Sequence, residues 1–123
     1  MSPGQLRRRC LAFPGAGEEF PFSPGLSVFK VGGKIFAIAP LGERPLDVSL
    51  KCEPVLAEQL RGTYPAIRPG YHLNKRHWNT VTIDGSLPDR LVLDLIEDSY
   101  DLVVDGLPKR LKARLGDAPE GLA

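Results

Sequence analysis

The first half of the chain alternates apolar and polar positions in a way that predicts β-strands. The run "LSVFKVGGKIFAI" (26–38) contains two β-rich segments separated by Gly32 and Gly33. Such a glycine pair suits a two-residue hairpin turn, which needs positive φ angles. This turn sets a register in which Phe29 faces Phe36, so we expect an aromatic pair across the two strands.

Further strands are expected on either side of a loop. "LDVSLKC" (46–52) alternates cleanly between apolar and polar residues, which predicts a half-buried strand. "RHWNTVTI" (76–83) is rich in β-branched and aromatic residues and also predicts a strand. A short strand is expected at 19–22, at a sheet edge because it contains a proline. The segment 63–74, with two prolines, predicts a loop.

Helical spacing appears first at the N-terminus and again in mid-chain. Ser2 can cap a helix that has Pro3 at its first position, and Gln5 is placed to reach back in a capping box. A second helix is expected over 54–61, ended by Gly62. Three apolar residues form its expected inner stripe: Val55, Leu56 and Leu60.

The last third of the chain predicts more helix. Ser86 is expected to cap it, with Asp89 three residues on in capping-box spacing. The apolar stripe shifts near Ser99, which predicts a kink or two short helices. "PKRLKARLG" (108–116) adds a last basic turn or two.

The order of these elements predicts the fold class. It is α-β-β-β-α-β-α-α, and most strand connections are short, so the sheet should be largely antiparallel with helices packed on one face. We therefore expect an α+β two-layer sandwich. The length of 123 residues fits a single domain, 1–123, with its core over about 3–115 and a frayed tail at 116–123.

Composition and charge exclude several classes of function. The net charge of +1 excludes a strongly basic nucleic-acid protein, so any cationic patch must be local. Residues 84–105 contain seven acidic side chains and one arginine, a net charge of −6. The rest of the chain therefore carries a net charge of +7. No stretch approaches the length of a membrane helix, and no signal-peptide run follows the N-terminal arginines. A cytoplasmic bacterial protein without a membrane partner is the expectation.

The sequence contains no pattern for metal or covalent chemistry. His72 and His77 are five apart, which is not the spacing of a helical zinc pair, and an odd separation in a strand puts them on opposite faces. Cys10 and Cys52 form no CxxC motif, so buried thiols are expected. No nucleophile–base arrangement or phosphate loop is present. We expect no catalytic residues, metal or cofactor, and no enzymatic activity.

The stretch "PGYHLNKRHW" (69–78) concentrates cations and aromatic rings. Cations bind phosphates, and aromatic rings can stack on bases. The candidate phosphate contacts are Lys30, Lys34, Arg68, His72, Lys75 and Arg76, and the aromatic or pocket candidates are Tyr71, His77 and Trp78. Lys30 and Lys34 flank the glycine turn, which could lie as a wing against a phosphate backbone.

Trp78 has a competing structural interpretation. A lone tryptophan usually supplies buried area, so we expect it in the core. Strand alternation, however, puts Trp78 on the face opposite Val81 and Ile83. Which of the two faces is buried stays open at this point.

Five segments resemble the MmcQ/YjbR family of small bacterial proteins: "FPF", "VFKVGGKIFA", "VSLKCEP", "YPAIRPGYHLNKRHWNTV" and "LIEDSYDLVVDGLPKR". The resemblance covers about residues 11–110. It implies a fold similar to that of secretion chaperones, and members are commonly labelled DNA-binding for a likeness to a double-wing motif.

Three functions follow as hypotheses. The first is a non-enzymatic DNA-binding module of weak, sequence-indifferent affinity that contacts phosphates. The second is a protein-interaction module, in keeping with the chaperone-like fold, and the third is a small-ligand pocket beside Tyr71, His72 and Trp78. A monomer is expected rather than an oligomer.

Overall fold

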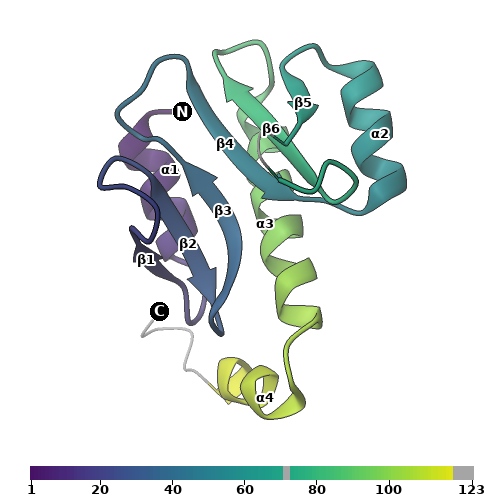
Figure 1. Ribbon diagram of the computed structural model, residues 1–123. Helices are drawn as coiled ribbons and strands as arrows, with labels where there is room; N and C mark the ends of the chain where they lie inside the picture. Colours follow the sequence, from purple (N-terminus) through teal and green to yellow (C-terminus); the bar gives the residue numbers. More distant parts are fainter. Residues whose placement is uncertain (71–72, 118–123) are drawn as a thin grey trace.

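The structure is a computed structural model that describes residues 1–70 and 73–117 (Figure 1). Its helices are α1 (Pro3–Leu11), α2 (Pro54–Thr63), α3 (Asp89–Asp105) and α4 (Lys109–Asp117). Its strands are β1 (Gly17–Glu19), β2 (Ser27–Val31), β3 (Lys34–Ala39), β4 (Leu46–Lys51), β5 (Ile67–Pro69) and β6 (Trp78–Ile83). No helix in these described ranges is long and apolar enough to cross a membrane.

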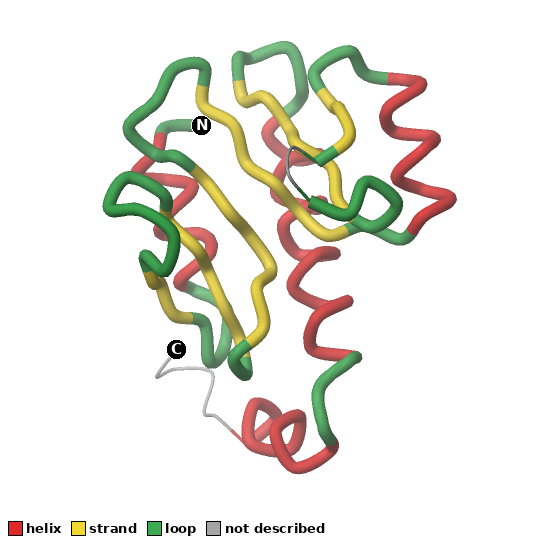
Figure 2. The backbone as a smooth tube through the Cα atoms, viewed as in Figure 1, coloured by secondary structure: helices red, strands yellow, loops and turns green. Residues whose placement is uncertain are grey.

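The strands form one antiparallel sheet in the order β1-β2-β3-β4-β6-β5. Helices α1 and α3 lie behind the sheet in Figures 1 and 2, α2 packs against β5 and β6, and α4 lies beyond the lower end. The predicted α+β fold with helices against an antiparallel sheet is confirmed. Two edge strands differ from prediction: β1 begins at Gly17 rather than Glu19, and β5 forms within the segment 63–74 that was expected to be a loop.

Strand β4 shows why the sheet has one apolar and one polar face. Its apolar residues Leu46, Val48 and Leu50 belong to the core, as the alternation predicted. Pairing with β6 brings Val48 opposite Val81, and Val81 is also buried in that core. The helix-facing side of β6 is therefore the side of Val81, which answers the question left open by the sequence.

Trp78 lies on the other face. It pairs with Lys51 at the end of the β4–β6 ladder, is only partly buried and lies outside the core cluster. The expectation of a core tryptophan is therefore wrong. The physical reason is that successive side chains of a strand point to opposite faces. Because Val81 faces the core, Trp78, three residues earlier, lies on the opposite face.

The hairpin between β2 and β3 has the predicted turn but a different register. Gly32 and Gly33 have φ angles of 57° and 79°, which favour glycine. A β-bulge then shifts the pairing, so that Phe29 lies opposite Ala37 and not opposite Phe36. The ring of Phe36 instead packs edge-on against Tyr100 of α3, with ring centroids 5.4 Å apart. The strand pattern alone encodes neither the bulge nor this contact with the helix.

The helix boundaries agree with the sequence at the N-terminus and differ later. The capping box of Ser2 and Gln5 is present. Helix α3 begins after Pro88, and Ser86 does not cap it; the backbone N–H of Ser86 donates to the Asp84 carboxylate instead. In α2, Val55 is 61% exposed rather than part of the inner stripe.

The sequence predicted a kink or two short helices near Ser99, and α3 is one continuous helix, so the division into two helices is wrong. Ser99 is completely buried and both hydrogen-bonding roles of its hydroxyl are used, which lets the apolar face continue past it. Most of the tail predicted to fray at 116–123 lies outside the described residues, and α4 extends to Asp117.

Candidate functional site

Strands β3 and β4 diverge at one end of the sheet. Their ladder contains two residue pairs, Ala37 with Leu50 and Ile38 with Ser49. Beyond them the Ser99 hydroxyl of α3 donates to the Phe36 carbonyl at 2.6 Å and accepts from the Lys51 amide at 2.8 Å. A helix side chain therefore takes the place of the next rung of the ladder.

A pocket of about 470 Å³ lies where the strands diverge. Ile35 and Trp78 line it from the strands, and Leu102 and Val103 line it from α3. Among the described residues, its charged lining consists of three lysines: Lys30, Lys34 and Lys51. The volume lies in the range of roughly 300–1,000 Å³ that proteins use for small-molecule sites.

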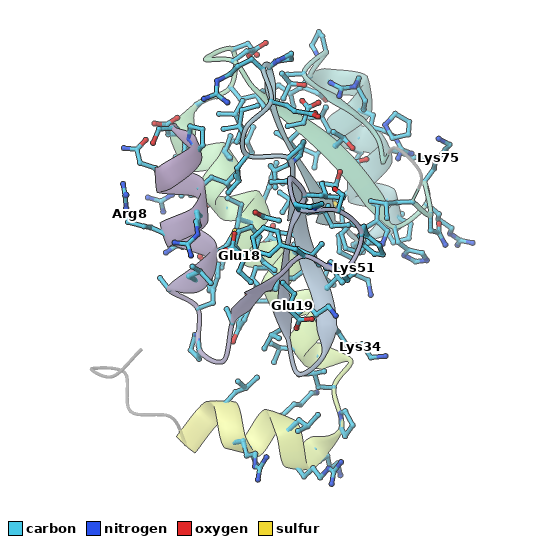
Figure 3. All side chains as sticks on the ribbon, turned by 60° about the vertical axis from the view of Figure 1, so that its left-hand side comes forward. Arg8, Glu18, Glu19, Lys34, Lys51 and Lys75 are labelled. Carbon is cyan, nitrogen blue, oxygen red and sulfur yellow. The ribbon has the colours of Figure 1, made fainter. Side chains whose placement is uncertain are left out.

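Two of these lysines are available to a ligand. Lys30 forms an ion pair with Glu19 at 3.2 Å, and its side chain is 23% exposed. Within the described part of the chain, Lys34 and Lys51 form no ion pair with a carboxylate. Figure 3 shows both of their side chains pointing outward on the same side of the molecule. The pocket therefore carries at least two uncompensated positive charges.

Close packing around two glycines holds the pocket lining in place. A Cβ on Gly32 would lie 2.8 Å from the Leu107 side chain, so the hairpin tip sits directly on the segment after α3. A Cβ on Gly70 would lie 2.8 Å from the Trp78 Cβ, and the Gly70 amide donates to the Trp78 carbonyl at 2.9 Å. A larger residue at Gly32 would require Leu107 to shift, and one at Gly70 would require Trp78 to shift.

The other predicted cations are not gathered at this pocket. Arg68 donates to Thr82 Oγ1 at 2.5 Å and forms an ion pair with Asp47 at 3.3 Å, so its charge is partly neutralised. Lys75 and Arg76 are exposed and line a separate hollow of about 440 Å³ beside α2. Figure 3 shows Lys75 on the same side as Lys34 and Lys51, above them.

The remaining predicted site residues are His77, Tyr71 and His72. His77 is partly buried and its backbone fixes the loop before β6: its amide donates to the Asn74 carbonyl and its carbonyl accepts from Cys52. Tyr71 and His72 lie outside the described residues. Among the residues placed by the structure, no group of three or more histidines, cysteines and acids could hold a metal ion.

An acidic hollow of about 210 Å³ adjoins the lysine pocket, and Leu102 lines both. Its carboxylates include Asp98, Asp101 and Asp105 on successive turns of α3. Burial, followed by the neighbouring carboxylates, raises the pKa values of Asp98 and Asp101 above their usual range. The surface potential must therefore change sign within a short distance across Leu102.

Lys51 was not among the candidates chosen from the sequence. It is one of the polar positions of the alternating strand 46–52, and it belongs to the motif "VSLKCEP". Its position opposite Trp78 follows from pairing between β4 and β6, which lie 27 residues apart along the chain. The pairing of Lys51 with Trp78 can be recognised only once the strand order is known.

Comparisons with known proteins agree with this architecture. A protein-family model described as YjbR matches residues 11–102. The uncharacterized protein YbdF of Escherichia coli O157:H7 is 40% identical over 109 residues, covering 89% of each chain. The uncharacterized protein YjbR of Escherichia coli K12 is 39% identical, covering 94% of this chain and 98% of that one.

Solved structures show the same fold. A Deinococcus radiodurans protein with a DUF419 domain has a TM-score of 0.88 and 41% identity, covering 97% of this chain and 90% of that chain. A Pseudomonas syringae protein has a TM-score of 0.73 and 30% identity, covering 84% of this chain and 99% of that chain. Because the family match covers most of the chain and these relatives match along nearly their full length, the chain belongs to the YjbR family.

Proposed function

We propose that this protein is a non-enzymatic nucleic-acid-binding module that contacts phosphates through Lys34 and Lys51. The observation that carries the proposal is their position at one pocket without a carboxylate partner in the described part of the chain. Lysines of this kind bind phosphates and release the counterions condensed on the nucleic acid. Lys30 contributes less, because Glu19 already compensates its charge.

The shape of the β2–β3 hairpin supports the same proposal. The tip packs on Leu107 at Gly32, the space beside Gly33 is open, and Lys34 follows directly. A hairpin tip of this kind can lie against a phosphate backbone as a wing. Helix α3 is unsuited to reading a groove, because its exposed side is rich in carboxylates.

Binding should be weak and indifferent to sequence. The few cations at the pocket contribute little electrostatic attraction to the binding affinity, and the net charge of the chain is only +1. An affinity of roughly 10⁻⁴ to 10⁻⁶ M is typical of binding through phosphate contacts alone. Lys75, which Figure 3 shows on the same side as Lys34 and Lys51, would extend the contact together with its neighbour Arg76.

Fluorescence anisotropy with labelled DNA at low salt tests the proposal. The double variant Lys34→Ala/Lys51→Ala should lower affinity about tenfold or more, since each lost phosphate contact weakens binding to every sequence alike. The control is Arg7→Ala/Arg8→Ala on α1, which removes the same formal charge; Arg8 lies on the opposite side in Figure 3. No binding of wild type at low salt would refute the proposal, and so would equal losses in both variants.

A specific observation favours a second candidate, a protein contact through the loop between β1 and β2. Phe20 and Phe22 in this loop are 52% and 66% exposed, which is unusual for large apolar side chains. In this case Phe20→Ser/Phe22→Ser would abolish co-purification of a partner while leaving the melting temperature unchanged. Light scattering should show the isolated chain to be a monomer.

A further inference from the structure

The pocket beside Trp78 combines three features that a flat phosphate-binding surface lacks. It is concave, its lining includes the apolar side chains of Ile35, Leu102 and Val103, and it also includes the aromatic ring of Trp78. We infer that it receives an unstacked base of single-stranded nucleic acid, with Trp78 as the stacking surface and Lys34 and Lys51 on the adjoining phosphates. This inference rests on the proposed function and specifies its ligand as single-stranded.

The position of Trp78 favours stacking on a base. It is the only tryptophan of the chain, it is partly exposed, and it lies outside the core. The β4–β6 register puts Lys51 directly opposite it, so an aromatic ring and a cation stand side by side at the end of two strands. Proteins that bind single strands combine such rings with cations that track the backbone.

A duplex fits this site poorly. Paired bases present their faces to one another and not to a protein side chain, so Trp78 could stack only on a base that has left the helix. In addition, Asp98, Asp101 and Asp105 line the hollow that adjoins the pocket at Leu102. These carboxylates would repel the second phosphate backbone of a duplex that rests on the lysines, whereas a single strand can avoid them.

Three cations on one side of the molecule could also contact one phosphate backbone. Lys34, Lys51 and Lys75 point outward on one side of the molecule in Figure 3. Lys75 and Arg76 belong to the loop that leads into β6, the strand that begins at Trp78. A strand stacked on Trp78 could therefore continue past this loop.

The test compares a single-stranded oligothymidylate of about 12 nucleotides with a duplex of the same length, at low salt, using the full chain. Intrinsic fluorescence reports directly on the site because all tryptophan emission comes from Trp78. We expect the single strand to bind about tenfold more tightly than the duplex and to quench this emission. Trp78→Leu should weaken single-strand binding about fivefold or more and leave duplex binding unchanged, whereas Trp78→Phe should retain most of the affinity.

The outcomes separate the two proposals. Binding of neither nucleic acid refutes the proposed function itself. Duplex binding as tight as single-strand binding, together with a harmless Trp78→Leu, overturns only the single-strand inference. Quenching by the mononucleotide dTMP at the affinity of the oligonucleotide would also overturn it, because the pocket would then be a small-ligand site. Circular dichroism of Trp78→Leu and Trp78→Phe confirms that each variant is folded before its affinity is compared.

Discussion

The hydroxyl of Ser99 accepts a hydrogen bond of 2.8 Å from the backbone amide of Lys51. Ser99 is fully buried on α3, while Lys51 is the last residue of β4 and lines the pocket. The same hydroxyl donates to the Phe36 carbonyl on β3. One helix side chain thus joins two strands at the point where they separate, and it fixes the backbone that carries one of the pocket lysines.

Replacing Ser99 by alanine should destabilise the protein by roughly 2–4 kcal/mol. Two backbone groups would lose their partner, and each buried group left unsatisfied costs about 1–3 kcal/mol. Urea unfolding measures the change. Ser23→Ala, in an exposed loop, is the control and should stay within about 0.5 kcal/mol of wild type. Equal stabilities of the Ser99 variant and wild type would show that the hydroxyl does not join the strands.

Stability should fall as the pH rises above 9, and Cys10 should be one cause. Burial raises the pKa of the Cys10 thiol from 9.0 to about 12. The folded state therefore holds this proton in the window between these values, where the unfolded chain releases it, and unfolding becomes more favourable as pH rises. At pH 10 this one group should cost about 1 kcal/mol relative to pH 7.

Urea unfolding of wild type and Cys10→Ala at pH 7 and pH 10 checks this prediction. The variant is expected to be less stable at both pH values because it leaves a cavity, but its loss between them should be smaller. A residual loss should persist, because the pKa values of Cys52 and Tyr100 are also raised by burial. Parallel losses in the two proteins would contradict a buried neutral thiol at Cys10.

Neutralising Asp101 should improve both stability and nucleic-acid binding. Burial and the carboxylates of Glu97, Asp98 and Asp105 raise its pKa, so its negative charge is unfavourable at neutral pH. Asp101→Asn should therefore raise the melting temperature slightly at pH 7, and this gain should vanish as pH falls through the raised pKa. It should also tighten binding of a duplex roughly twofold at low salt, because it weakens the repulsion between the acidic hollow and the second backbone.

A matched control for this variant is Glu43→Gln. It removes one exposed carboxylate from the loop at the far end of β4 and should leave affinity unchanged. Should both substitutions tighten binding equally, the effect would be one of net charge rather than of the acidic hollow. Thermal melts and anisotropy titrations supply both measurements.

The sequence predicted the local elements well, because their signals are local. The alternation of β4, the glycine turn of the hairpin and the capping box of Ser2 each depend on a few neighbouring residues. The bulge at Phe36 was not predictable in this way, and the ring of Phe36 contacts Tyr100, which lies far along the chain.

The candidate site was only partly predictable for the same reason. Lys30, Lys34 and Trp78 were candidates on residue type, and the structure brings all three to one pocket. Arg68 also has the right chemistry, but its ion pair with Asp47 depends on strand pairing that no spacing rule reveals. The strand order determines which cations pair with a carboxylate, and the sequence pattern does not encode that order.

The central claim is that Lys34 and Lys51 contact phosphates, and the salt dependence of binding tests it most directly. Affinity for a single-stranded oligonucleotide should be measured over a series of salt concentrations for wild type, Lys34→Ala/Lys51→Ala and the control Arg7→Ala/Arg8→Ala. Two lost contacts should reduce the slope of log K against log [salt] by about 1.4 in the lysine variant and leave it unchanged in the control. A lysine variant with the wild-type slope would contradict the account.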